Sequence, residues 1–212
     1  MTHVLVAGVS TRAAAESAAR AGFAVTAIDA FGDLDQHPSV GGFALPHNFT
    51  ARAAAMAART VECDAVVYLS SFENHPKAIT TLAEGRALWG NSPETVRRVR
   101  DPLLLAEALR RRGLSAPQVR LKPDTTYPVD TNDKSHVTNS YVVSGFGRTV
   151  NQWLVKPLAS GGGQRIRLWD PATILPRGCY LQEFIDGPAG SVVFVAAGGR
   201  AVPIGVSRLL VG

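Results

Sequence analysis

The strongest constraint on the fold is a strand–helix–strand pattern at the N-terminus. Residues 3–9 form an apolar run typical of a buried strand, an alanine-rich helix follows as far as Gly22, and residues 23–28 form a second strand. This order and spacing predict a βαβ unit with parallel strands and a right-handed crossover. After a loop expected at residues 31–48, a helix capped by Thr50 and a strand at residues 64–69 continue the pattern. We therefore expect an N-terminal parallel α/β sheet.

A polar loop after the third expected strand is the first candidate for ligand contact. Open α/β sheets bind ligands at the carboxyl ends of their strands. The residues there include Glu73, Asn74 and His75, which we take as a candidate substrate loop. The alternative is an ordinary polar loop that carries a lone histidine.

The first βα turn bears on dinucleotide binding. Asp29 follows the second strand, where an acidic residue can hold a ribose, but the turn that starts at Gly8 has one glycine in place of Gly-x-Gly-x-x-Gly. NAD is therefore disfavoured, and a Rossmann-like dinucleotide-binding domain is kept as an alternative.

A second constraint is a strand, a glycine loop and a strand between residues 153 and 168. Side chains 153–156 alternate between two faces, Gly161, Gly162 and Gly163 follow, and a strand period then resumes. Because glycine lacks a Cβ, the loop N–H groups can close on a phosphate chain, and Lys156 can donate to the same charge. A P-loop has its lysine after the glycines, so the order excludes it. The alternative is a hairpin with a flexible turn and an exposed lysine.

A short strand that ends at a Gly-Pro turn follows, with the sequence Tyr-Leu-Gln-Glu-Phe-Ile-Asp-Gly at residues 180–187. Together the two segments resemble the ATP-grasp superfamily, in a carboligase-like branch related to biotin carboxylase and the carboxylate–amine ligases. The resemblance implies that Lys156 and Ser160–Gly163 cover the triphosphate of ATP. It also implies that the backbone of the hinge reads the adenine edge, with Gln182 facing its amino group. The hinge residues are Gln182, Glu183, Phe184 and Ile185.

The same resemblance implies contacts that this sequence does not supply. Many members carry a second phosphate-facing lysine after an aspartate, but here Pro102 follows Asp101, so that contact is absent or comes from Arg100. Members bind Mg²⁺ through a Glu and a Glu or Asn late in the domain. Residues 187–212 contain no Asp, Glu or Asn. We therefore expect no metal ligands in this chain, Mg²⁺ ligands in a missing C-terminal half, and a final hairpin around Gly198-Gly199 with an unpaired edge.

Composition and charge indicate which classes of binding partner the chain can have. The net charge is +5 and the pI is about 9.6, but the arginine clusters at residues 97–100 and 110–112 lie on expected helices without interleaved aromatic residues. We expect no nucleic-acid partner. No apolar stretch approaches a membrane span, and the two cysteines lie far apart. We expect a cytoplasmic protein with a small-molecule substrate, and the sequence leaves the oligomeric state undefined.

The expected fold class is α/β, with a Rossmann-like parallel sheet of the pre-ATP-grasp type followed by an incomplete α+β ATP-grasp module. Residues 1–90 form the first domain, and residues 91–117 form a helical entrance with caps at Ser92 and Asp101. Residues 118–150 are expected to be a poorly ordered insertion, and residues 151–212 to be truncated nucleotide-binding strands. The expected function is the ATP-binding part of a ligase that activates a carboxylate as an acyl phosphate for attack by an amine. A non-catalytic fragment is the other alternative.

Overall fold

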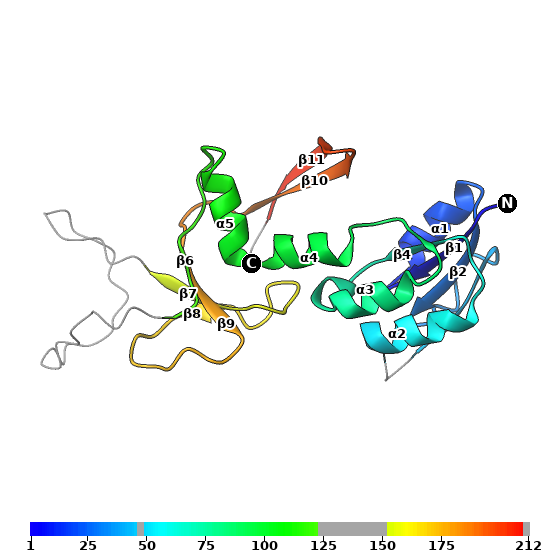
Figure 1. Cartoon of the computed structure of the whole chain (residues 1–212), viewed down its shortest axis with the longest axis horizontal. Coiled ribbons are helices and arrows are strands. Elements are labelled where there is room, and N and C mark those ends of the chain that lie inside the picture. Colours follow the sequence, from blue (N-terminus) through cyan, green and yellow to red (C-terminus); the bar gives the residue numbers. More distant parts are fainter. Residues whose placement is uncertain (46–48, 123–151, 210–212) are drawn as a thin grey trace, which may run out of the picture.

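A computed structural model of the chain describes residues 1–45, 49–122 and 152–209 (Figure 1). The insertion expected at residues 118–150 lies outside the described residues, apart from its first five positions, which include the short strand β6 (Val119–Arg120). The proposed domain boundaries stay predictions.

The N-terminal part of the chain is a parallel sheet with helices on both faces, as the βαβ pattern predicts. The five strands lie in the order β3-β2-β1-β4-β5, and every neighbouring pair is parallel. The strands are β1 (His3–Ala7), β2 (Ala24–Asp29), β3 (Val40–Ala44), β4 (Ala65–Tyr68) and β5 (Ala87–Leu88). The helical segments are α1 (Arg12–Arg20), α2 (Ala51–Ala57), the 3₁₀ turn η1 (Ala58–Thr60), the 3₁₀ turn η2 (Phe72–Asn74) and α3 (Pro76–Leu82).

Alternating side chains of the central strands form two cores. On one face, Leu5 and Val66 are buried with residues of α2 and α3 such as Ile79. On the other face, Val4 and Val6 are buried against α1. A strand buried on both faces reads as a continuous apolar run, which is why the sequence predicts β1 and β4 so clearly.

The expected loop at residues 31–48 is wrong in part, because it contains β3 at the edge of the sheet. Two adjacent glycines, Gly41 and Gly42, interrupt the alternation of apolar and polar side chains by which a strand is predicted. Gly42 has φ +151°, and a Cβ there would lie 2.1 Å from the carbonyl oxygen of Ala27 on β2. The glycine therefore permits a backbone approach that no other residue could make.

Two capped helices lead from the parallel sheet to the second half of the chain (Figure 1). The Ser92 hydroxyl accepts from Thr95 N–H at the start of α4 (Pro93–Arg100), and the Asp101 carboxylate accepts from Leu103 and Leu104 N–H at the start of α5 (Pro102–Arg110). Proline at the first position of each helix completes the predicted caps. None of the helices in the described ranges is long and apolar enough to cross a membrane.

The second sheet has four strands in the order β6-β9-β7-β8. It consists of β6, β7 (Trp153–Pro157), β8 (Arg167–Leu168) and β9 (Cys179–Glu183), all antiparallel. The strand, glycine loop and strand predicted between residues 153 and 168 are β7, the connecting loop and β8. Val155 and Leu181 are buried on one face, so the residues that alternate with them, including Lys156, belong to the other.

The described chain ends in a two-stranded antiparallel ribbon, β10 (Gly190–Ala197) and β11 (Arg200–Arg208). Its turn is Gly198-Gly199, and both glycines have positive φ, as a tight hairpin requires. All its residues are exposed, and no other strand of the described residues pairs with it (Figure 1).

Candidate functional site

Lys156 lies in the middle of the second sheet and is half-buried. Its Nζ donates to Oε1 of Gln182 at 3.1 Å and lies 6.0 Å from the centroid of the Tyr180 ring. Tyr180 is its cross-strand partner on β9, and Gln182 is the next residue on the same face. Burial lowers the pKa of Lys156, and none of the described carboxylates forms an ion pair with it. The ammonium therefore has a neutral partner and spare donors.

The glycine loop between β7 and β8 leaves its backbone accessible. Gly162 and Gly163 have φ of +61° and +71°, and a Cβ on either would contact nothing within 4 Å. Gly161 faces the first half of the chain, because a Cβ there would lie 3.6 Å from Oε1 of Glu73. Open space around Gly162 and Gly163 lets a ligand approach the loop backbone.

Arg100, at the C-terminus of α4, joins the glycine loop to the candidate substrate loop. Its Nη2 donates to the carbonyl oxygen of Ser160 at 2.7 Å and to Oδ1 of Asn74 at 2.6 Å. Both acceptors are neutral, so neither offsets the positive charge of the guanidinium beside the loop. The sequence offers Arg100 as a replacement cation, but it does not indicate that this side chain bridges the segments of Asn74 and Ser160, one on each side of it in the chain.

The expected hinge has fewer free backbone donors than its four residues suggest. Glu183 N–H donates to the carbonyl of Gln118, and Phe184 N–H donates to the carbonyl of Gln152. Ile185 N–H makes no hydrogen bond to a described residue. Phe184 and Ile185 are exposed beyond the end of β9, whereas Gln182 and Glu183 are half-buried within it.

Two of the candidate segments, the glycine loop and the substrate loop, therefore meet, and the hinge residue Gln182 accepts from Lys156 on the strand before the glycine loop. Glu73 lies beside Gly161, Asn74 accepts from Arg100, and His75 is exposed at the start of α3. Asn74 and His75 also line a separate hollow against α2.

Acidic groups are sparse around the glycine loop. The carboxylate of Glu73 lies beside Gly161 of this loop. The described residues contain no group of three or more His, Cys, Asp or Glu that could hold a metal ion. One carboxylate does not make a Mg²⁺ site by itself. The described residues therefore do not fit a resident Mg²⁺, and the expectation that its ligands lie outside this chain stays a prediction.

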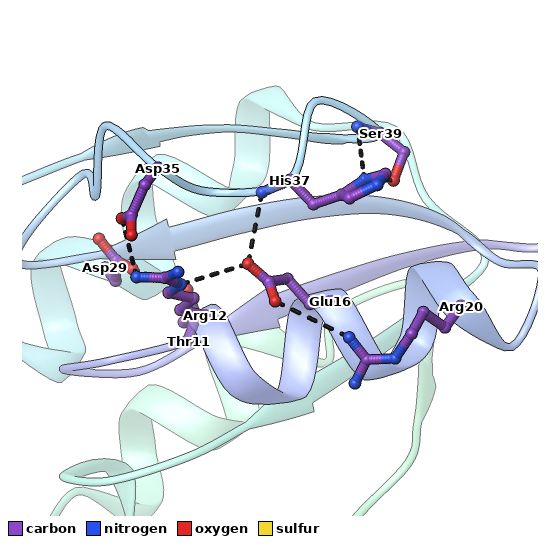
Figure 2. Close-up of polar contacts among 8 residues, drawn as sticks. All are labelled: Thr11, Arg12, Glu16, Arg20, Asp29, Asp35, His37 and Ser39. Carbon is purple, nitrogen blue, oxygen red and sulfur yellow. Dashed lines mark hydrogen bonds and ion pairs between the residues drawn. The ribbon is translucent and has the colours of Figure 1, made fainter.

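Asp29, the residue suggested for ribose binding, forms hydrogen bonds within the protein, one of them with Thr11 (Figure 2). The buried carboxylate accepts from the Thr11 hydroxyl at 2.8 Å, from Phe31 N–H at 3.0 Å and from Gly32 N–H at 2.9 Å. Burial by itself would raise the pKa of Asp29, but these hydrogen bonds outweigh burial and lower it. Both carboxylate oxygens are thus already engaged, which further disfavours a dinucleotide.

Further polar contacts lie next to Asp29, between α1 and the loop that follows β2 (Figure 2). Arg12 Nη1 donates to Asp35 at 2.7 Å, and Arg12 Nε donates to Glu16 at 3.2 Å. Glu16 also accepts from His37 N–H at 3.3 Å. These contacts fasten the loop between β2 and β3 to α1, which is a structural role.

No protein-family model and no curated protein matches the chain. Solved structures do. The L-amino acid ligase from Bacillus licheniformis superimposes with a TM-score of 0.64 at 19% identity, over 98% of this chain and 50% of that one. N5-carboxyaminoimidazole ribonucleotide synthetase from Thermotoga maritima gives 0.63 at 15% identity, over 99% of this chain and 54% of that one. A putative ATP-grasp superfamily protein from Archaeoglobus fulgidus gives 0.61 at 14% identity, over 100% of this chain and 62% of that one.

The chain spans about half the length of the solved structures it matches. At these identities the similarity shows the fold, and it confirms the α/β architecture that the resemblance implies. One of these structures, N5-carboxyaminoimidazole synthetase from Staphylococcus aureus, was solved in complex with ADP.

Proposed function

We propose that this chain, which has the fold of ATP-grasp proteins, forms the ATP-binding part of a carboxylate–amine ligase. The observation that carries the proposal is Lys156, a half-buried ammonium with a neutral partner on the strand that leads into an open glycine loop. A buried cation without a carboxylate is unfavourable unless an anion arrives to compensate it. The triphosphate of ATP is such an anion.

Two cations flank the loop that would close on the phosphates. Lys156 precedes it on β7, and Arg100 donates to the carbonyl of Ser160 within it. Arg100 keeps this end of the loop in place, while Gly162 and Gly163 leave the rest of its backbone free to adapt. The N–H groups of such a loop and two flanking cations are suited to a phosphate chain.

The adenine would lie against the end of β9. Ile185 N–H forms no hydrogen bond with the described residues and could donate there, and Gln182 can present its side-chain oxygen to the adenine amino group. Because Lys156 donates to that same oxygen, Gln182 links the phosphate and adenine ends of the site. Glu183 and Phe184 would contribute their carbonyls, since their N–H groups are occupied.

The proposed reaction has two steps. A substrate carboxylate oxygen attacks the γ-phosphorus of ATP, and the bond from that phosphorus to the β–γ bridging oxygen breaks. ADP is the leaving group, and the substrate becomes an acyl phosphate. An amine then attacks the acyl carbon, phosphate leaves, and the amine loses a proton as the amide forms. Lys156 and Arg100 would stabilise the phosphate charge in the first step, and the closed loop would exclude water.

The small-molecule substrate would contact the loop after β4. A Cβ on Gly161 would lie 3.6 Å from Oε1 of Glu73, and Asn74 accepts from Arg100, which supports a substrate position next to the proposed phosphate site. In many ATP-grasp enzymes Mg²⁺ neutralises the phosphates. Its ligands are expected outside this chain, so no step is assigned to it.

The test is ATP binding by isothermal titration calorimetry with a matched pair of lysine variants. Lys156→Gln should weaken ATP binding about tenfold, the effect of one charge-assisted hydrogen bond. Lys122→Gln removes the same charge from an exposed residue outside the site and should leave ATP affinity unchanged. Equal affinities for the two variants would reject the nucleotide site. Binding of NADH in preference to ATP would favour the dinucleotide alternative.

A further inference from the structure

A second basic site lies on the parallel-sheet half of the chain, away from Lys156. Helices α2, α3 and α4 pack in sequence along one side of the molecule (Figure 1). Between them is a hollow of about 620 Å³, within the size range of small-molecule sites. Four of its lining residues are basic or can become so, namely Arg52, His75, Lys77 and Arg97.

No acidic residue of the described chain lines this hollow. Arg52, Lys77 and Arg97 form no ion pair with the described residues, as is also true of other arginines such as Arg98, while four arginines elsewhere do. The paired arginines are Arg12, Arg20, Arg59 and Arg111. Unpaired cations on one helix are usually a solvated face, but here they converge from three elements on one concavity. Such an arrangement concentrates positive potential where a ligand can enter.

The rest of the lining indicates the size and chemistry of the ligand. Ala55, Met56 and Ala78 give the hollow an apolar floor, and Asn74 and Thr81 add neutral polar groups. Two arginines favour phosphate, because the planar guanidinium binds its oxygens in pairs. We propose that this hollow, defined by Arg52, His75, Lys77 and Arg97, binds a small phosphate-bearing ligand.

The hollow is connected to the glycine loop by two hydrogen bonds. Asn74 lines it and accepts from Arg100, which also donates to the carbonyl of Ser160. Ligand binding in the hollow needs no nucleotide at Lys156, so the two sites can be tested separately.

The experiment is calorimetric titration of the full chain with inorganic pyrophosphate at constant ionic strength, without ATP. Pyrophosphate could also bind beside Lys156, so the titration is made in the Lys156→Gln background. Adding Arg52→Gln and Arg97→Gln together should weaken binding at least about tenfold, from the loss of two charge-assisted contacts. Adding Arg98→Gln, on the same helix but outside the lining, should change it less than about twofold.

A second readout does not depend on variants. Among the histidine ring resonances in the NMR spectrum, that of His75 should move on titration, while those of His3 and His37 should not. Absence of pyrophosphate binding, a loss with the Arg52→Gln and Arg97→Gln pair no greater than with Arg98→Gln, or tighter binding of citrate than of pyrophosphate would each overturn the phosphate site. Loss of all binding with Lys156→Gln alone would assign pyrophosphate to the nucleotide site and also overturn it.

Discussion

Asp29 shows how a residue typical of one function can serve the fold. Its carboxylate accepts from Thr11, Phe31 and Gly32, and these hydrogen bonds lower its pKa although burial opposes them. From the sequence, an acid after the second strand could equally hold a ribose. The distinction depends on where two loop N–H groups point, which no sequence period encodes.

The lowered pKa of Asp29 predicts an acid-sensitive contribution to stability. Because the pKa is below its unfolded value of about 3.9, the stabilisation is fully present above that pH and is lost as the pH falls through the folded pKa. Asp29→Asn should cost about 1–3 kcal/mol near neutrality. Thermal unfolding of both proteins as a function of pH should show the difference shrinking below about pH 4. The exposed Asp186→Asn should cost little, and a constant difference for Asp29→Asn would contradict the assignment.

The buried amine of Lys156 predicts that ATP affinity depends on pH. Burial lowers its pKa, so the amine loses its charge at a lower pH than an exposed lysine does. A neutral amine does not attract phosphate, so affinity should fall as the pH rises, and the fall should begin at a lower pH than the titration of an exposed lysine would give. Lys156→Arg stays charged as the pH rises and should flatten the profile, which calorimetry at each pH can measure. A parallel fall in both proteins would place the titrating group elsewhere.

At the scale of elements, β3 depends on one glycine. Gly42→Ala would place a Cβ 2.1 Å from the carbonyl oxygen of Ala27, with φ +151° as a further strain. We expect a loss of about 2–4 kcal/mol in the free energy of unfolding, measured in urea. Gly41→Ala is the control, because its Cβ would lie at an ordinary 3.7 Å from the nearest atom. Similar losses of stability for both variants would mean that the cause is not the close approach of Gly42 to the Ala27 carbonyl, but a general need for glycine in β3.

Periodic segments and capped helices were predictable, and close contacts between distant segments were not. The apolar runs of β1 and β4 and the caps of α4 and α5 follow from local chemistry, and the structure agrees. The edge strand β3 was missed because glycines carry no period. Lys156 could be placed on a strand face from alternation, but its contact with Gln182 depends on the register of β7 and β9.

At the scale of the whole molecule, the proposed site draws on both halves of the chain. Arg100 comes from the helices that link the two sheets, and it joins Asn74 of the first half to Ser160 of the second. The described part of the chain leaves the β10–β11 ribbon exposed on both faces, with apolar side chains such as Phe194 and Ile204 more than half exposed. The structure thus shows one wall of the proposed nucleotide site and no described segment that covers it.

This arrangement predicts ATP binding that is separate from turnover. Glu73 is the carboxylate beside Gly161, the described residues contain no cluster of three or more possible metal ligands, and residues 187–212 contain no Asp, Glu or Asn that could hold Mg²⁺. ATP should therefore bind weakly and saturably, and Lys156→Gln should reduce that binding. A coupled assay for ADP with MgCl₂, amino acids and short carboxylic acids should show no steady-state release from either protein. Turnover that requires Lys156, in the absence of any other chain, would mean that this chain supplies its own metal ligands, and the division of labour proposed for it would be wrong.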